Sequence, residues 1–235
     1  MDFSELYDRS YVPYSEAPAV AVVRTTDGQW FPGIRIENIS YPLSISASQN
    51  ALFSCISEGH HPESLHANPT DDPIVDYWKK EFGLNLYDLD TKNPPTTKFE
   101  PTTLPADIEI VEHLKQLLDQ ARVEESNFPV SALVGTGDGF YAGVNIECSA
   151  WNMGLCAERV AIAKAFTYGS TPLQSLHIHT RYGEFSSPCG ACRQVISEHL
   201  QHKQIYLHHS DESESVHFSE DLLPHSFQSS SLSNQ

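Results

Sequence analysis

The second half of the chain shows a regular order of hydrophobic and polar positions. From Ile108 to Val123 the apolar residues recur every three or four positions, which predicts an amphipathic helix. Residues 128–136 and 139–147 predict two strands, and the Asp-Gly pair that begins at Asp138 is typical of a hairpin turn. We therefore expect a helix followed by a hairpin.

Helical and strand patterns alternate beyond this hairpin. Residues 155–166 and 189–200 predict helices, whereas residues 176–180 and 204–207 predict strands. A helix, a hairpin and then alternating helices and strands are typical of an α/β fold in which helices cover a mixed sheet.

The first half of the chain repeats part of the second half at a constant offset. Residues 32–59 align with residues 142–169 without gaps, and a hairpin pattern with Asp27-Gly28 at its turn also precedes the first copy. Six aligned pairs are identical: Gly33 and Gly143, Ile36 and Ile146, Glu37 and Glu147, Ala47 and Ala157, Ala51 and Ala161, and Gly59 and Gly169. The repeat predicts a duplicated fold.

Prolines are frequent between the two copies. Residues 61–105 contain too many of them for regular structure throughout, so we interpret this region as a linker or covering segment. Within it, residues 74–82 predict a short helix that ends at Gly83. The predicted domains are a degenerate first copy at 1–60, the proline-rich segment at 61–105, a catalytic domain at 106–228 and a polar tail at 229–235.

The chain is strongly acidic. It has 31 Asp and Glu residues against 14 Lys and Arg, for a formal net charge of −17. This charge would repel a phosphate backbone, so we expect no nucleic-acid partner. The sequence contains no apolar run of membrane-spanning length and no basic, apolar leader, so we expect no membrane association and a cytoplasmic location.

Two segments near the C-terminal end carry the candidate chemistry. They read Cys156-Ala157-Glu158-Arg159 and Pro188-Cys189-Gly190-Ala191-Cys192-Arg193-Gln194. Thiolates of Cys156, Cys189 and Cys192 would hold Zn²⁺ and leave a fourth position for water, as catalytic zinc sites require. Glu158 stands two residues from a ligand, where a carboxylate can move protons. Arg159 and Arg193 are expected to offset the negative charge by hydrogen bonds to the sulfurs.

The first copy lacks this chemistry. Ser46 and Ser48 stand where the second copy has Cys156 and Glu158, and no Cys-x-x-Cys pair follows them. We therefore expect one zinc ion per chain and a first copy that is degenerate or truncated before the second metal helix.

The cysteines also allow two other interpretations, a structural zinc site and a redox pair. A structural zinc site would need a fourth ligand such as His177 or His179, but both alternate with apolar residues as strand histidines do. A thioredoxin-like redox pair would leave Cys156 and Glu158 without a role. We interpret the two remaining cysteines, Cys55 and Cys148, as small buried residues.

These motifs resemble the cytidine deaminase family in its three-cysteine zinc form. Three thiolates with a glutamate that is not a ligand are the arrangement of zinc nucleobase deaminases. The likeness extends from about residue 108 to residue 227 and includes Ser126-Asn127-Phe128-Pro129-Val130, Gly143-Val144-Asn145-Ile146-Glu147 and Leu222-Leu223-Pro224-His225-Ser226-Phe227. It departs from the family pattern at Ser131 and Cys148.

The resemblance implies a three-layer α/β/α fold with a mixed central sheet, present here in two copies. It also implies that Asn145 and Glu147 hydrogen-bond the ribose, that Phe128 packs on the pyrimidine, and that the Ala157 backbone holds a base edge. Phe227 resembles the aromatic residue that family oligomers lend to a neighbouring active site. Family members with one catalytic and one vestigial domain imply a homodimer.

The expected activity is hydrolytic deamination of free cytidine and 2′-deoxycytidine to the uridine forms, with release of ammonia, in pyrimidine salvage. One alternative is deamination of another aminopyrimidine nucleoside such as blasticidin S, whose deaminase has similar motifs. Another is a zinc-stabilised binding protein without catalysis, although such a protein has no use for Glu158. Editing of RNA or DNA is disfavoured by the charge.

Overall fold

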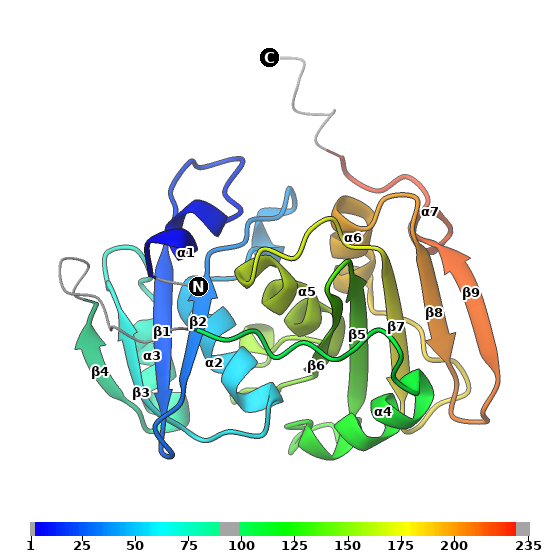
Figure 1. The fold of residues 1–235 in the computed structure, drawn as a ribbon, viewed down its shortest axis with the longest axis horizontal. Helices are drawn as coiled ribbons and strands as arrows, with labels where there is room; N and C mark the ends of the chain where they lie inside the picture. Colours follow the sequence, from blue (N-terminus) through cyan, green and yellow to red (C-terminus); the bar gives the residue numbers. More distant parts are fainter. Residues whose placement is uncertain (1–2, 90–98, 229–235) are drawn as a thin grey trace.

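Two β-sheets lie on either side of a central pair of helices in the computed structural model, which describes residues 3–89 and 99–228 (Figure 1). The first sheet has four strands in the order β2-β1-β3-β4, and the second has five in the order β6-β5-β7-β8-β9. Neighbouring strands are antiparallel except for the parallel pairs β3/β4 and β7/β8. The mixed α/β fold expected from the sequence is confirmed.

Both halves pass through the same order of elements. The first half contains α1 (Phe3–Arg9), β1 (Val20–Thr25), β2 (Trp30–Ile34), η1 (Tyr41–Leu43), α2 (Ala47–Ser57), β3 (Pro62–Ala67), α3 (Val75–Phe82) and β4 (Asn85–Asp88). The second half contains α4 (Ile110–Leu117), η2 (Leu118–Gln120), β5 (Val130–Thr136), β6 (Gly139–Val144), η3 (Trp151–Met153), α5 (Ala157–Thr167), β7 (Ser175–Thr180), α6 (Gly190–His199), β8 (Gln204–His208), β9 (Glu214–Phe218) and α7 (Ser219–Leu222). The helices and strands predicted from periodicity are present with shifted ends.

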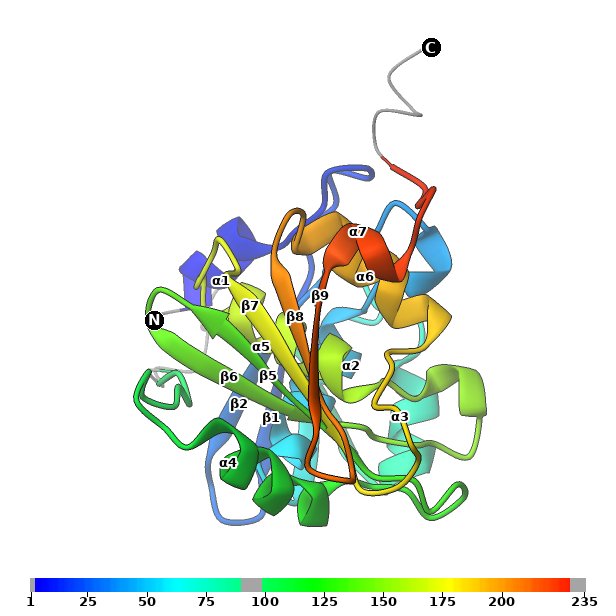
Figure 2. The same ribbon diagram turned by 90° about the vertical axis from the view of Figure 1, so that its right-hand side faces the viewer.

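Helices cover both faces of the second sheet. Residues of α5 and α6 pack on one face, where Ala132, Ile178 and Leu207 point. On the other face Leu114 of α4 packs with Leu133, and Figure 2 shows α4 and α6 on opposite sides of the strands. Because side chains alternate along a strand, β5 supplies Ala132 and Val134 to one layer and Leu133 to the other. The expected three-layer arrangement is confirmed for this half.

The interpretation of residues 61–105 as a linker is wrong for much of that segment. β3 pairs antiparallel with β1, and β4 pairs parallel with β3, so both strands belong to the first sheet. Pro62 is tolerated because it is the first residue of its strand. The short helix predicted here is α3, and Gly83 ends it in the left-handed region with φ 66°. Pro94-Pro95 lies outside the described residues.

The duplication is visible in the packing of equivalent glycines. A Cβ on Gly33 would lie 2.3 Å from the Ala47 carbonyl oxygen, and a Cβ on Gly143 would lie 2.4 Å from that of Ala157. Only glycine permits such an approach of strand and helix. α3 follows β3 as α6 follows β7, so the expectation that the first copy ends before its second helix is wrong. Among the described residues, the first copy lacks counterparts of η2, β9 and α7.

Reciprocal hydrogen bonds join the two halves. Gln49 Nε2 donates to the Met153 carbonyl at 2.7 Å, and Arg159 Nη2 donates to the Leu43 carbonyl at 2.8 Å. The gapless alignment of the two copies pairs the two donors with each other and the two acceptors with each other, so α2 and α5 meet around a pseudo-two-fold axis. One hydrophobic cluster also includes residues of both halves, among them Val160 of α5. The halves therefore share a core.

His199, the last residue of α6, makes the fold sensitive to acid. Its ring packs against those of Tyr11 and Phe166, with centroids 5.1 and 4.9 Å away, and burial lowers its pKa from 6.5 to about 4. Between these pH values the unfolded chain binds more protons than the folded one, so stability falls as the pH falls. Phenylalanine cannot be protonated, so His199→Phe should avoid this loss. At pH 4 the variant is expected to retain up to about 3 kcal/mol of unfolding free energy that the parent loses.

Urea unfolding of both proteins from pH 8 to pH 4 measures the effect. Phenylalanine should fit, since Phe82 has the same place at the end of α3. If the unfolding free energies of the parent and the variant fall in parallel down to pH 4, His199 is not the source of the acid sensitivity.

Candidate active site

Two helix starts bring the three candidate ligands together. Cys156 is the N-cap of α5, Cys189 is the N-cap of α6, and Cys192 lies in the first turn of α6. Their sulfurs all lie within 4.8 Å of one another. The Cys156 and Cys189 sulfurs are 3.6 Å apart, and tetrahedral zinc with bonds of about 2.3 Å separates two sulfurs by about 3.8 Å. The soft donor set and its spacing therefore fit Zn²⁺.

The three thiols of the cluster differ in pKa. Hydrogen bonding from the Cys156 thiol, and then from Cys192, lowers the pKa of Cys189, and backbone N–H groups at the start of α6 add to this. The hydrogen bond with Cys189 raises the pKa of Cys156, and hydrogen bonds with Cys156 and then with Cys189 raise the pKa of Cys192. Cys189 is therefore the first thiolate of the cluster. Because zinc must displace the other two thiol protons, its affinity for the site rises with pH.

Glu158 lies in the first turn of α5 and is 2% exposed. Burial, the largest cause, raises the pKa of its carboxyl to about 7, and the neighbouring charge of Cys189 acts in the same direction. Its Oε2 has no hydrogen-bond partner in the described part of the chain. A buried carboxyl that titrates near neutrality and keeps one oxygen free is suited to take and return protons.

The two arginines of the motifs stabilise backbone and do not contact the sulfurs. Arg193 donates to the Pro188 carbonyl at 2.9 Å, to the Leu222 carbonyl at 3.3 Å and to Ser187 Oγ at 2.6 Å. Arg159 donates to Leu43 in the first half. Within residues 3–89 and 99–228 neither arginine donates to a cysteine, so the expected hydrogen bonds to sulfur are not observed.

A cavity of about 190 Å³ opens beside Cys156. The residues that line it are Asn145, Ile146, Glu147, Cys148, Trp151, Gly154, Leu155 and Cys156. The structure thus brings the two polar residues expected to bind ribose to the same cavity as one zinc ligand. Sequence reasoning did not include Trp151, which is 71% exposed.

Asn145 and Glu147 are held by backbone groups. Asn145 Oδ1 accepts from the Val130 N–H at 2.8 Å, and its Nδ2 donates to the Phe128 carbonyl at 2.9 Å. Glu147 Oε2 accepts from the N–H groups of Glu125 and Ser126 at 3.0 and 3.1 Å. These bonds hold both side chains in place, and in the described part of the chain they use only Oε2 of Glu147.

The two aromatic candidates are exposed. Phe128 is 39% exposed and Phe227 is 48% exposed, so neither is a core residue. Gln194 binds the backbone of Phe227 on both sides, accepting its N–H at 3.2 Å and donating to its carbonyl at 2.8 Å. The last residue of the second cysteine motif therefore anchors the C-terminal segment, a role that sequence reasoning missed.

The corresponding place in the first half holds a different set of groups. Ser46 is the N-cap of α2, and the Ser48 N–H donates to Asp72 Oδ2 at 2.9 Å. Asp72 precedes α3 and is 2% exposed. The Asp72 carboxylate thus connects the starts of α2 and α3 in the first half. In the second half the equivalent helix starts, of α5 and α6, carry the three cysteines. The role of Asp72 could not be predicted because this residue lies in the segment interpreted as a linker.

The remaining cysteines and strand histidines are structural. Burial raises the pKa of Cys55 to about 12 and that of Cys148 to about 11, which keeps both as neutral thiols. His177 Nδ1 lies 3.2 Å from His208 Nε2, and His179 Nδ1 lies 2.9 Å from the His208 carbonyl. Among the described residues, the three cysteines form the only cluster with metal-ligand geometry. No histidine of the described residues belongs to that cluster.

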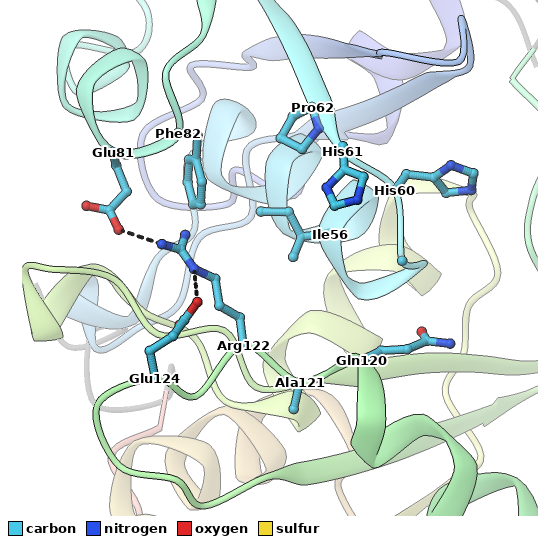
Figure 3. Close-up of a pocket in the computed structure, with 11 residues that line it drawn as sticks. Ile56, His60, His61, Pro62, Glu81, Phe82, Gln120, Ala121, Arg122 and Glu124 are labelled. Atoms are coloured by element: carbon cyan, nitrogen blue, oxygen red, sulfur yellow. Dashed lines mark hydrogen bonds and ion pairs between the residues drawn. The ribbon is translucent and has the colours of Figure 1, made fainter.

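A larger cavity of about 540 Å³ lies between the two halves (Figure 3). The labelled residues that line it include His60, Glu81 and Arg122. None of the three clustered cysteines contributes to its wall, so we do not place the reaction there.

Comparisons with known proteins agree with this site. A family profile described as "Cytidine and deoxycytidylate deaminase zinc-binding region" matches residues 105–208, and a second profile with the same description matches residues 4–67. The first match contains the three cysteines and Glu158. The second match falls on the half that lacks them, which supports the duplication.

Individual relatives align with about half of the chain or less. A cytidine deaminase of Sporosarcina psychrophila is 43% identical over 90 residues, which are 38% of this chain and 66%, just under two thirds, of the relative. One from Mycoplasma genitalium is 31% identical over 123 residues, which are 52% of this chain and 95% of the relative. The solved cytidine deaminase from Burkholderia pseudomallei is 31% identical and covers 50% of this chain and 95% of its own, with a TM-score of 0.47.

Helices of the described part of the chain are all too short or too polar to cross a membrane.

Proposed function

The chain belongs to the cytidine deaminase family, and we propose that it hydrolyses free cytidine and 2′-deoxycytidine to the uridine forms with release of ammonia. The observation that supports this most directly is the cluster of three cysteine sulfurs beside a buried glutamate with one free oxygen. Cys156, Cys189 and Cys192 would hold one Zn²⁺ per chain.

When bound, zinc supplies an open coordination position and acidifies water. Glu158 takes a proton from the attacking water and then delivers protons to the ring nitrogen and to the departing ammonia. Its pKa of about 7 suits both directions of transfer. Burial at 2% exposure keeps bulk water from competing for these protons.

Substrate binding is proposed for the cavity beside Cys156. Asn145 and Glu147 line that cavity and would hydrogen-bond the ribose hydroxyls, with Glu147 Oε1 as an acceptor. The Ala157 N–H at the start of α5 has no carbonyl one turn earlier in the helix and would bind a base edge. Phe128, which is partly exposed, would pack on the pyrimidine.

A homodimer would complete the site. Phe227 is exposed and anchored through its backbone, so its ring is available to cover the pocket of a second copy. A cytoplasmic location and a role in pyrimidine salvage are further proposals. They are supported by five free cysteines, of which three must stay reduced to bind metal.

A panel of free nucleosides followed by ammonia release tests the proposed substrates. We expect turnover of cytidine and 2′-deoxycytidine, and none of adenosine, since the relatives that match the chain are cytidine deaminases. Blasticidin S in the same panel checks the alternative substrate. Zinc-loaded protein that releases ammonia from neither cytidine nor 2′-deoxycytidine would contradict the proposal.

A further inference from the structure

Helix α3 of the first half contacts the segment that follows β6 and leads into η3 of the second half. Glu81 accepts hydrogen bonds from both the N–H and the hydroxyl of Ser149, the former at 3.1 Å. The Tyr77 hydroxyl accepts from the Ala150 N–H at 3.2 Å and donates to Glu81 at 3.2 Å. Two successive backbone N–H groups of the catalytic half are therefore bound by one helix of the degenerate half.

A third contact comes from α2. Gln49 Nε2 donates to the Met153 carbonyl at 2.7 Å, and Gln49 is 6% exposed. Together the three side chains bind both ends of residues 149–153. This segment has little support of its own, since Trp151 is largely exposed and η3 is a single short turn.

The bound segment is part of the substrate cavity. Cys148 and Trp151 line that cavity, with Glu147 just before the segment and Gly154 immediately after it. A movement of residues 149–153 would therefore displace the cavity wall. The zinc ligand Cys156 belongs to α5 and is fixed separately by the helix.

Glu81 is an ionised and well-fixed acceptor. Burial alone would raise its pKa, but the hydrogen bonds from Ser149 and the charge of Arg122 outweigh this, and the pKa is lowered. Arg122 Nη2 lies 3.4 Å from Glu81, as Figure 3 shows, and the Glu81 side chain is 6% exposed. Hydrogen bonds to a buried charged acceptor are stronger than those between neutral groups.

We propose that the degenerate first half is a clamp for nucleoside binding: Glu81, Tyr77 and Gln49 are positioning residues that hold residues 149–153 of the catalytic half against the substrate. This inference rests on the proposed function of the cavity. The first half, which has neither the cysteine ligands nor the catalytic glutamate, would thus support substrate binding in the second half. None of the three residues touches the reacting atoms.

The pseudo-symmetric contact supplies a matched control. Glu198 on α6 accepts from the Ile39 N–H at 2.9 Å and from the Tyr14 hydroxyl at 2.9 Å. Ile39 is the counterpart of Ser149 in the gapless alignment of the two copies. Glu198 thus makes the same kind of contact with the first half, where no substrate is expected.

Glu81→Gln in the full-length zinc-loaded chain tests the clamp. We expect KM for cytidine and Kd for uridine, measured by calorimetry, to rise about tenfold, with kcat and zinc content within about twofold of the parent. Hydrogen exchange of peptides covering residues 148–154 should become faster. Glu198→Gln should leave KM and Kd unchanged.

Two results would overturn the clamp: KM and Kd within about twofold of the parent, or losses of kcat and zinc that match a loss of thermal stability. The uridine titration does not depend on turnover, so an inactive parent would refute the proposed function and still test the clamp. Should Glu81→Gln fold poorly, Tyr77→Phe removes one hydroxyl while its ring keeps packing on Trp78. Tyr14→Phe is its control, and the same outcomes apply.

Discussion

Glu158→Gln is expected to reduce kcat/KM for cytidine on the order of 10²- to 10⁴-fold, since a positioned proton-transfer group contributes about that much. The amide has nearly the same shape as the carboxyl, but it cannot take a proton from water or return one to the base. Glu158 is not a ligand, so the protein should keep its zinc. Ammonia release and metal analysis on the same sample measure both results.

Ser48→Ala is the matched control for this variant. Ser48 stands at the equivalent place in the first half and is equally buried, at 0% exposure. Its loss should leave kcat/KM within about twofold of the parent, as expected for a change away from the site. Full activity of Glu158→Gln would remove the basis of the mechanism. Loss of zinc from that variant would mean that the glutamate has a structural task as well.

Cys189→Ser is expected to abolish zinc binding and, with it, activity. Cys189 has the lowered pKa of the cluster and is the thiolate on which the other two thiols converge. A serine hydroxyl remains protonated at neutral pH and is a poor zinc ligand. Because the metal would connect the starts of α5 and α6, we also expect a fall in Tm of at least about 5 °C.

Metal analysis after dialysis and a thermal melt measure these effects. Cys55→Ala is the control, since Cys55 is fully buried in the first half and does not belong to the cluster. That variant should lose some stability but keep zinc and activity. Retention of one zinc per chain by Cys189→Ser would contradict the assigned ligand set.

Most of the second half was predictable from the sequence because its signals are local. Apolar residues at helical spacing predicted α4, alternation and an Asp-Gly turn predicted β5 and β6, and the cysteine motifs stand at two predicted helix starts. The gapless repeat predicted the first hairpin and α2 in the same way. These features depend on residues that are neighbours in the chain, so spacing alone reveals them.

β3 and β4 were not predictable in this way. Both are short strands in a proline-rich region, and the larger part of their stability comes from pairing with β1 and with each other. Short strands of this kind are defined largely by their pairing partners, and prolines nearby in the sequence hide the strand pattern. Asp72 was missed for the same reason.

Short segments of the sequence indicate the chemistry of the candidate site, with three cysteines and one glutamate in the second half, because residue type and position at a helix start are local properties. The task proposed for the first half depends instead on how the whole chain packs. The bonds of Glu81, Tyr77 and Gln49 to residues 149–153 each join groups that are far apart in the chain. Such contacts form when the packing of the two halves brings side chains to free backbone groups. They involve residues distant in sequence, so no local sequence pattern predicts them.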